Sequence, residues 1–264
     1  MNKRIALIII VLTLLFFASL EYATAEECLL DISLVLDTSG SMGSSWDGST
    51  RIDVLKDSVK SFIDAQPEDG TRWVGIVSFS STATVVHNLI KIDDSGDKTS
   101  LKNAIDALSA SGSTAMDAGI QTGATMLIPG SGRADCYKVM IVVSDGYPDD
   151  DVAAENAANA AKAQGIVIIG VFIGSPSGDG DEFLRDEIAQ HPYYPYFINV
   201  TDPNDLPTAF EDLANKICIL AKPKKPVGGG IIPLSKFELI VPWIVSAAVI
   251  VATIAFAKKY IFKF

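Results

Sequence analysis

The chain has 264 residues, of which 48% are hydrophobic, and it carries a formal net charge of −11. This length allows one sizeable domain plus shorter segments, and the hydrophobic fraction argues against a disordered chain. Residues 26–221 hold 30 acidic and 12 basic residues, a net charge of −18, so we expect neither nucleic acid nor anionic lipid surfaces as partners of this region.

The first 25 residues have the features of a secretory signal. Lys3 and Arg4 precede an almost wholly apolar run at residues 5–20, and Ala23-Thr24-Ala25 offers the small residues that signal peptidase prefers. We therefore expect cleavage after Ala25. An uncleaved anchor helix is the alternative, although the run is a little shorter than the roughly 20 residues that a bilayer requires.

Residues 26–221 alternate between apolar runs and helical patterns. Strands are expected at 29–36, 73–79, 83–89, 139–143, 166–173 and 196–200, and helices at 51–65, after a cap at Asp97 or Thr99, and at 115–127, 152–164, 182–189 and 206–220. Only three residues separate the second and third strands, so these two should form an antiparallel hairpin. The alternation predicts a doubly wound α/β domain with a mostly parallel sheet, one antiparallel edge hairpin and helices on both faces.

The C-terminal segments have the composition of a tether and a membrane anchor. Residues 222–238 are rich in Pro, Gly and Lys, which suits a semi-rigid linker. Residues 239–257 carry no charge, so we expect a transmembrane helix in preference to a buried core helix, followed by a short basic tail at 258–264. Since cations flank both apolar segments, the positive-inside rule places both ends in the cytoplasm and the domain outside the cell.

The chain contains three cysteines, Cys28, Cys136 and Cys218. Cys28 and Cys218 lie just inside the two ends of the expected domain, where a disulfide would join the first strand to the last helix. An exported location permits such a bond. Cys136 then remains as a buried thiol, and its pairing with either of the other two stays open.

The end of the first strand carries the pattern Asp37-Thr38-Ser39-Gly40-Ser41. The glycine permits a tight backbone path, so the loop can direct one carboxylate and two hydroxyls at a common point. Oxygen donors without nearby Cys or His favour a hard cation such as Mg²⁺ or Mn²⁺. Metal binding is therefore the first functional hypothesis.

Two further residues are expected at the same edge of the sheet. The strand at 139–143 runs into Ser144 and Asp145, and ligands of open α/β sheets bind beyond the carboxyl ends of the strands. Thr114, in a Ser- and Gly-rich break between two helices, offers a third hydroxyl. If the two Asp-terminated strands are neighbours, all five side chains converge.

This set of residues resembles the von Willebrand factor type A family and its metal-ion-dependent adhesion site. Asp37, Ser39 and Ser41 match the Asp-x-Ser-x-Ser loop, Thr114 the later threonine, and Asp145 the later aspartate. The resemblance covers about residues 28–218 and implies a Rossmann-like fold and a bound Mg²⁺, with Mn²⁺ or Ca²⁺ as alternatives. It also implies that the final helix, with Phe210, Leu213 and Ile217 on one stripe, shifts when ligand binds; a 28–218 disulfide would limit that shift.

The resemblance implies an adhesion-type function at the cell surface. The two aspartates act largely through water in the family's ligand-binding state, which leaves one position of the cation open for an Asp or Glu carboxylate of a partner protein. The alternative is a membrane-anchored assembly subunit of an envelope protein complex. We do not expect an enzyme, because neither His87 nor His191 sits beside a candidate nucleophile and the acid expected two residues after a phosphatase-type aspartate is Ser39.

Overall fold

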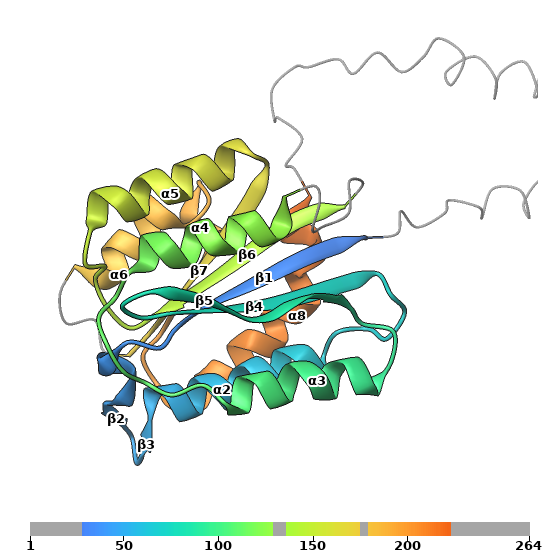
Figure 1. Ribbon diagram of the computed structural model, residues 1–264, viewed down its shortest axis with the longest axis horizontal. Coiled ribbons are helices and arrows are strands. Elements are labelled where there is room, and N and C mark those ends of the chain that lie inside the picture. The colour runs from blue at the N-terminus through green and yellow to red at the C-terminus, as the bar shows by residue number, and fades with distance from the viewer. Residues whose placement is uncertain (1–27, 129–135, 175–178, 223–264) are drawn as a thin grey trace, which may run out of the picture. The chain divides into compact units, whose positions relative to one another are not determined.

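The computed structural model describes residues 28–128, 136–174 and 179–222, which form a six-stranded sheet with helices on both faces (Figure 1). The strand order is β5-β4-β1-β6-β7-β8. The strands are β1 (Leu30–Asp37), β4 (Arg72–Phe79), β5 (Ala83–Lys91), β6 (Tyr137–Ser144), β7 (Ile166–Ile173) and β8 (Phe197–Val200). All neighbours are parallel except β4 and β5, which are antiparallel. The predicted α/β class and the antiparallel edge hairpin are thus confirmed.

The helices divide into two layers. One face of the sheet carries α2 (Arg51–Asp64), α3 (Ser95–Asp106) and α8 (Leu206–Ala221), and the other carries α4 (Met116–Leu127), α5 (Asp151–Ala163) and α6 (Gly180–Phe183), as Figure 1 shows. Shorter helical pieces are η1 (Gly40–Gly43), η2 (Leu184–Ile188), α7 (Tyr193–Tyr196) and η3 (Pro203–Asp205). Each layer encloses its own hydrophobic core.

Strand β1 lies in the middle of the sheet, and all eight of its residues are buried. Successive side chains of a strand point to opposite faces. Leu34 and Leu36 accordingly join the core under α2 and α8, while Val35 joins the core under α4 and α5. On the α4 side Gly123 lies so close to the strand that an added Cβ would sit 2.6 Å from Val35 Cγ2. This burial on both faces explains the nearly continuous apolar run in the sequence, which only Asp31 and Ser33 interrupt.

Helix α2 buries one stripe of side chains against α8. Thr50 caps its start by accepting a hydrogen bond from the Asp53 N–H. At the other end of the stripe, Phe62 meets Phe210 of α8 edge to face, with ring centroids 6.2 Å apart. The contact fixes α8 against the helix whose first turn adjoins the end of β1.

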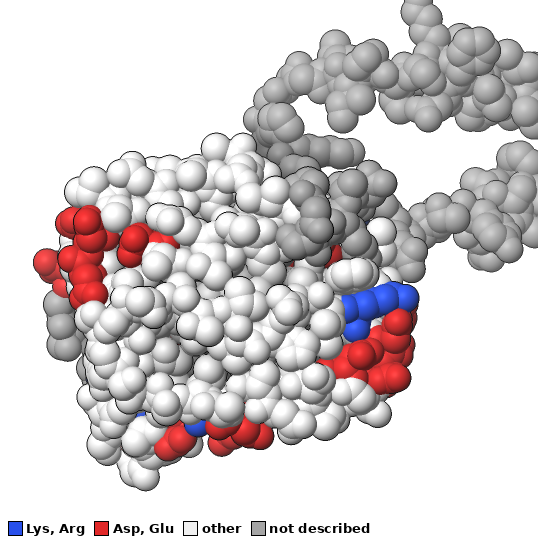
Figure 2. All heavy atoms as spheres, in the orientation of Figure 1, with Lys and Arg blue, Asp and Glu red and all other residues white. Residues whose placement is uncertain are grey.

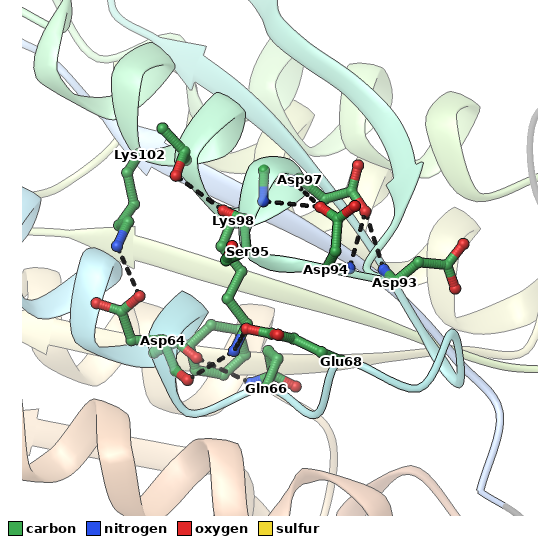
Figure 3. A network of polar contacts seen from close by, with 12 residues as sticks. Asp64, Gln66, Glu68, Asp93, Asp94, Ser95, Asp97, Lys98 and Lys102 are labelled. Atoms are coloured by element: carbon green, nitrogen blue, oxygen red, sulfur yellow. Dashed lines mark hydrogen bonds and ion pairs between the residues drawn. The ribbon is translucent and has the colours of Figure 1, made fainter.

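The start of α3 differs from the prediction, since its cap is Asp94 and neither Asp97 nor Thr99. Asp94 accepts from the N–H groups of Gly96 and Asp97, and the Asp97 carboxylate accepts from the Asp94 N–H, which makes a reciprocal capping box. Figure 3 shows this cap beside Lys98 and Lys102, which bind the Asp64 carbonyl and carboxylate at the end of α2. These two lysines tie α3 to α2.

Two local elements depart from the expected pattern. The helix predicted at 182–189 consists of α6 followed by a π turn, η2. The loop after η1 contains a small ribbon of β2 (Ser45–Trp46) and β3 (Ser49–Thr50), which was not predicted. Its turn places Asp47 and Gly48 at φ 48° and 87°, and an Asp-Gly pair at positive φ is typical of a tight hairpin.

A disulfide joins Cys28 to Cys218, with the two Cα atoms 6.1 Å apart. It connects the residues before β1 to the last turn of α8, which confirms the pairing predicted from the sequence. Cys136, just before β6, lies outside this bond and is half-buried, so the prediction of a buried thiol was wrong.

Within residues 28–128, 136–174 and 179–222, none of the helices combines the length and apolar character needed to cross a membrane. The predicted signal at 1–25, most of the linker, the expected span at 239–257 and the tail at 258–264 lie outside the described residues. These four expectations remain predictions from the sequence.

Candidate metal centre

The candidate site lies where β1 and β6 end side by side. The two strands are hydrogen-bonded and parallel, with Leu36 opposite Val143, so Asp37 at the end of β1 and Asp145 just after β6 emerge at the same edge. The convergence of the two carboxylates was predicted from the sequence on the condition that these strands are neighbours, and the structure meets that condition. The edge is also a reversal point, since β4 lies on one side of β1 and β6 on the other.

Asp37 is fully buried and its carboxylate is held by neutral donors. Oδ1 accepts from the Ser39 N–H at 2.7 Å, and Oδ2 accepts from the Ser144 hydroxyl at 2.6 Å. Burial raises the pKa of Asp37 to about 6, because removal from water disfavours the ionised form more than these hydrogen bonds favour it. A cation beside this group would supply the missing favourable interaction.

Ser39, Ser41 and Asp145 form a chain of contacts across the loop. The hydroxyls of Ser39 and Ser41 lie 2.9 Å apart, and Ser41 Oγ donates to Asp145 Oδ1 at 2.7 Å. Ser39 and Asp145 are both buried, and Ser41 is exposed. The turn η1 produces this arrangement, since the Met42 N–H bonds the Ser39 carbonyl and keeps the two hydroxyls on one side.

Thr114 belongs to a second loop that is bound to the first through the backbone. The Gly40 N–H donates to the Gly112 carbonyl at 2.9 Å, and the Ser111 N–H donates to the Thr38 carbonyl at 2.8 Å. Gly112 has φ +83°, a conformation that favours glycine, and an added Cβ would sit 2.6 Å from Ser81 Oγ. The structure thus brings the loop that carries Thr114 against the loop that carries Asp37, Ser39 and Ser41.

Three residues beyond the predicted ligands take part in the site. Ser144 holds Asp37, as described above. Asp149 accepts from the Thr114 N–H at 2.9 Å and donates its own N–H to the Thr114 carbonyl at 3.0 Å, so it fixes the threonine loop. Arg51, the first residue of α2, donates from Nη1 to Asp145 Oδ2 at 2.6 Å. Asp149 and Arg51 have no local signal, because their roles depend on contacts between distant elements.

Trp46, in the loop that follows the candidate metal ligands, belongs to the core beneath that loop. Its side chain is 8% exposed, and its indole N–H donates to the Thr201 carbonyl at 3.3 Å. Trp46 therefore packs over the loop and offers no contact surface beside the site.

The oxygen donors fit a hard divalent cation. Contacts of 2.7–2.9 Å link the hydroxyls of Ser39 and Ser41 to the Asp145 carboxylate, and the Asp37 carboxylate accepts from the backbone N–H of Ser39 at 2.7 Å. In the part of the chain that the structure describes, no three His, Cys, Asp or Glu side chains gather into a group that could hold a metal ion. A site with two carboxylates needs hydroxyl ligands to complete its coordination, and such oxygen donors suit Mg²⁺ or Mn²⁺.

The sequence profile described as "von Willebrand factor type A domain" matches residues 31–212 of the chain. The chain belongs to the von Willebrand factor type A family. The match runs from β1 into α8 and includes every residue of the candidate metal centre.

Among relatives, human calcium-activated chloride channel regulator 4 is 30% identical over 143 residues, which cover 54% of this chain and 14% of the relative. Among solved structures, the pilus adhesin SpaC of Lactobacillus rhamnosus GG superposes with a TM-score of 0.62 at 18% identity, covering 73% of this chain and 31% of the adhesin. Proximal thread matrix protein 1 from the mussel byssus, described with a zinc-occupied MIDAS motif, gives 0.56 at 21%, covering 73% and 46%. At these identities the two structures share the fold with this chain.

The chain spans between 14% and 45% of the length of the first curated relatives that it matches, all of which extend beyond the shared domain. The similarity therefore establishes the family of the domain at residues 31–212. It does not assign the activity of any whole relative to this protein.

Proposed function

We propose that the domain is a metal-dependent protein-binding module that recognises an acidic side chain of a partner. The observation that carries the proposal is the convergence of Asp37, Ser39, Ser41 and Asp145 at one edge of the sheet, with the Thr114 loop bound beside them. Von Willebrand factor type A domains are generally binding modules without catalytic activity, in keeping with this proposal. In the adhesion-type interpretation, Asp37, Ser39, Ser41, Thr114 and Asp145 hold the cation.

When bound, the cation supplies a Lewis-acidic position for a carboxylate oxygen of the partner. The residues of the chain provide the rest of the function. The hydroxyls of Ser39 and Ser41 are neutral, so they hold a cation without cancelling its charge. Buried Asp37, fixed by Ser39 and Ser144, keeps the ligand set rigid, since its contacts leave little rotational freedom.

The surface around the site narrows the class of partner. Figure 2 shows acidic side chains gathered at the end of the domain where α5 and α6 begin, and Asp149, Asp150 and Asp151 are exposed in this region. An approaching carboxylate meets this negative rim before it reaches the cation. We therefore expect the acidic residue of the partner to be flanked by basic side chains, which would offset the repulsion and make binding sensitive to salt.

We further propose that the domain stands outside the cell on a single membrane anchor. The proposal rests on the signal-like residues 1–25, the uncharged span at 239–257 and the flanking cations. The alternative role, as an assembly subunit of an envelope complex, would use the same metal centre toward a neighbour in the same membrane. Crosslinking on intact cells distinguishes the two roles, since partners confined to that membrane favour assembly.

A matched pair of hydroxyl deletions tests the binding function. Thr114→Ala is expected to reduce Mg²⁺-dependent capture of a partner by at least about tenfold, because loss of one ligand weakens a hard-cation site. Ser113→Ala is the control, since this neighbouring hydroxyl contacts Ser81 and belongs to no predicted ligand set. Capture from membrane extracts with Mg²⁺ and with EDTA provides the measurement. Equal capture by Thr114→Ala and wild type in Mg²⁺, or equal capture with and without EDTA, would contradict the proposal.

A further inference from the structure

Arg51 occupies an unusual position for a cation. It is the first residue of α2, and its guanidinium reaches the metal-centre edge of the sheet. Positive charge at the start of a helix is opposed by the helix dipole, which favours anions there. The side chain is only 21% exposed, and its Nε is buried without a hydrogen-bond partner. Arg51 is thus held in place chiefly by Asp145.

A glycine beside Arg51 leaves space for the guanidinium of the ion pair. Gly174, just after β7, lies so close to the guanidinium that an added Cβ would sit 3.2 Å from its Nε and Nη2 atoms. A side chain at this position would press directly on Arg51. The guanidinium therefore lies between Asp145, just after β6, and Gly174, just after β7.

Both carboxylate oxygens of Asp145 accept a hydrogen bond from the chain itself. Oδ1 accepts from Ser41, and Oδ2 accepts from Arg51 at 2.6 Å, while the carboxylate is fully removed from solvent. A divalent cation that binds Asp145, directly or through water, would bind a carboxylate whose charge the Arg51 guanidinium already neutralises. The two positive charges also repel each other at short range in a poorly hydrated site.

We propose that Arg51 is an internal counter-ion that competes with the divalent cation for Asp145 and so sets the metal affinity of the site. The inference rests on the proposed metal centre. In the metal-free protein Arg51 neutralises Asp145, and metal binding weakens or breaks that ion pair. The site consequently binds divalent cations more weakly than the same oxygen ligands would without Arg51.

Arg51→Gln tests this competition against Lys56→Gln, which removes the same charge from the same helix at a residue that contacts the Asp106 carbonyl of α3. By calorimetric titration with Mn²⁺, Arg51→Gln is expected to bind about tenfold more tightly than wild type, because a nearby like charge is gone. Lys56→Gln should match wild type within about twofold, because a partly exposed, more distant charge is screened. Thermal unfolding should show Arg51→Gln less stable than wild type in EDTA and more strongly stabilised by Mn²⁺.

The outcomes separate the inference from the function beneath it. Equal Mn²⁺ affinity in wild type and Arg51→Gln would overturn the counter-ion role and leave the metal centre in place. Absence of Mn²⁺ binding in both proteins would overturn the metal centre and the inference with it. If Arg51→Gln does not fold, a structure of the wild-type protein with Mn²⁺ decides: separation of Arg51 from Asp145 beyond salt-bridge distance supports the inference, and an unchanged 2.6 Å contact contradicts it.

Discussion

Asp37→Asn is expected to make the metal-free protein more stable at pH 7.5 and to abolish its stabilisation by Mg²⁺. Burial raises the pKa of Asp37 to about 6, above the value near 3.9 of an unfolded chain. The folded state therefore binds more protons than the unfolded state between about pH 4 and 6, so the free energy of unfolding falls as the pH rises through this window. At neutral pH the ionised group costs up to about 3 kcal/mol, a cost that neutral asparagine removes while its oxygen still accepts from the Ser39 N–H.

Thermal unfolding of wild type and Asp37→Asn between pH 5 and 8, in EDTA and in Mg²⁺, measures these effects. For wild type, the stabilisation by Mg²⁺ should weaken as the pH falls below about 6, because the proton competes with the cation for Asp37. Asp57→Asn removes a carboxylate that is 76% exposed on α2 and serves as the charge-matched control. If Mg²⁺ stabilises Asp37→Asn as strongly as it stabilises wild type, Asp37 is not a ligand.

Removal of the Cys28–Cys218 disulfide is expected to lower the free energy of unfolding by about 2–5 kcal/mol. The bond joins residues 190 positions apart, so it restricts the unfolded chain strongly, and it fastens the end of α8 beside the start of β1. Urea unfolding of a variant with serine at both positions gives the measurement, and Cys136→Ser is the control for loss of a half-buried sulfur. A double variant as stable as the control would contradict this role.

The same bond bears on coupling between α8 and the metal centre. The resemblance to von Willebrand factor type A domains implies a shift of the final helix upon ligand binding, whereas the disulfide ties the last turn of α8 to the residues before β1. If the disulfide restrains a coupled shift, mild reduction should change the affinity for a partner. Equal affinity before and after reduction would show that α8 is not coupled to the site.

The sequence predicted the sheet well because its central strands are buried on both faces. A residue string such as Leu34-Val35-Leu36 must be apolar throughout, and this makes the strand visible without any tertiary information. The Asp94 cap and the β2–β3 ribbon were missed for a different reason. Several Asp, Ser and Thr residues compete for the cap position there, and an Asp-Gly turn with two-residue strands gives almost no periodicity.

At the candidate site, the sequence predicted the residues that follow directly after strand ends and missed those that arrive from elsewhere. Asp37 and Asp145 are placed by the ends of β1 and β6, so their convergence follows from the topology. Arg51 reaches Asp145 only because the first turn of α2 lies beside the end of β6, which is a tertiary contact. Its position within an otherwise ordinary amphipathic helix gave no sign of that role.

The most direct test of the metal centre is anomalous diffraction at the manganese edge from crystals of the protein grown in Mn²⁺. One anomalous peak is expected at the carboxyl edge of β1 and β6, at about 2.0–2.3 Å from the hydroxyl oxygens of Ser39 and Ser41. Thr114 should line the same peak. Saturating Mn²⁺ with no peak between these side chains, or with the peak confined to the exposed aspartates at the start of α5, would contradict it.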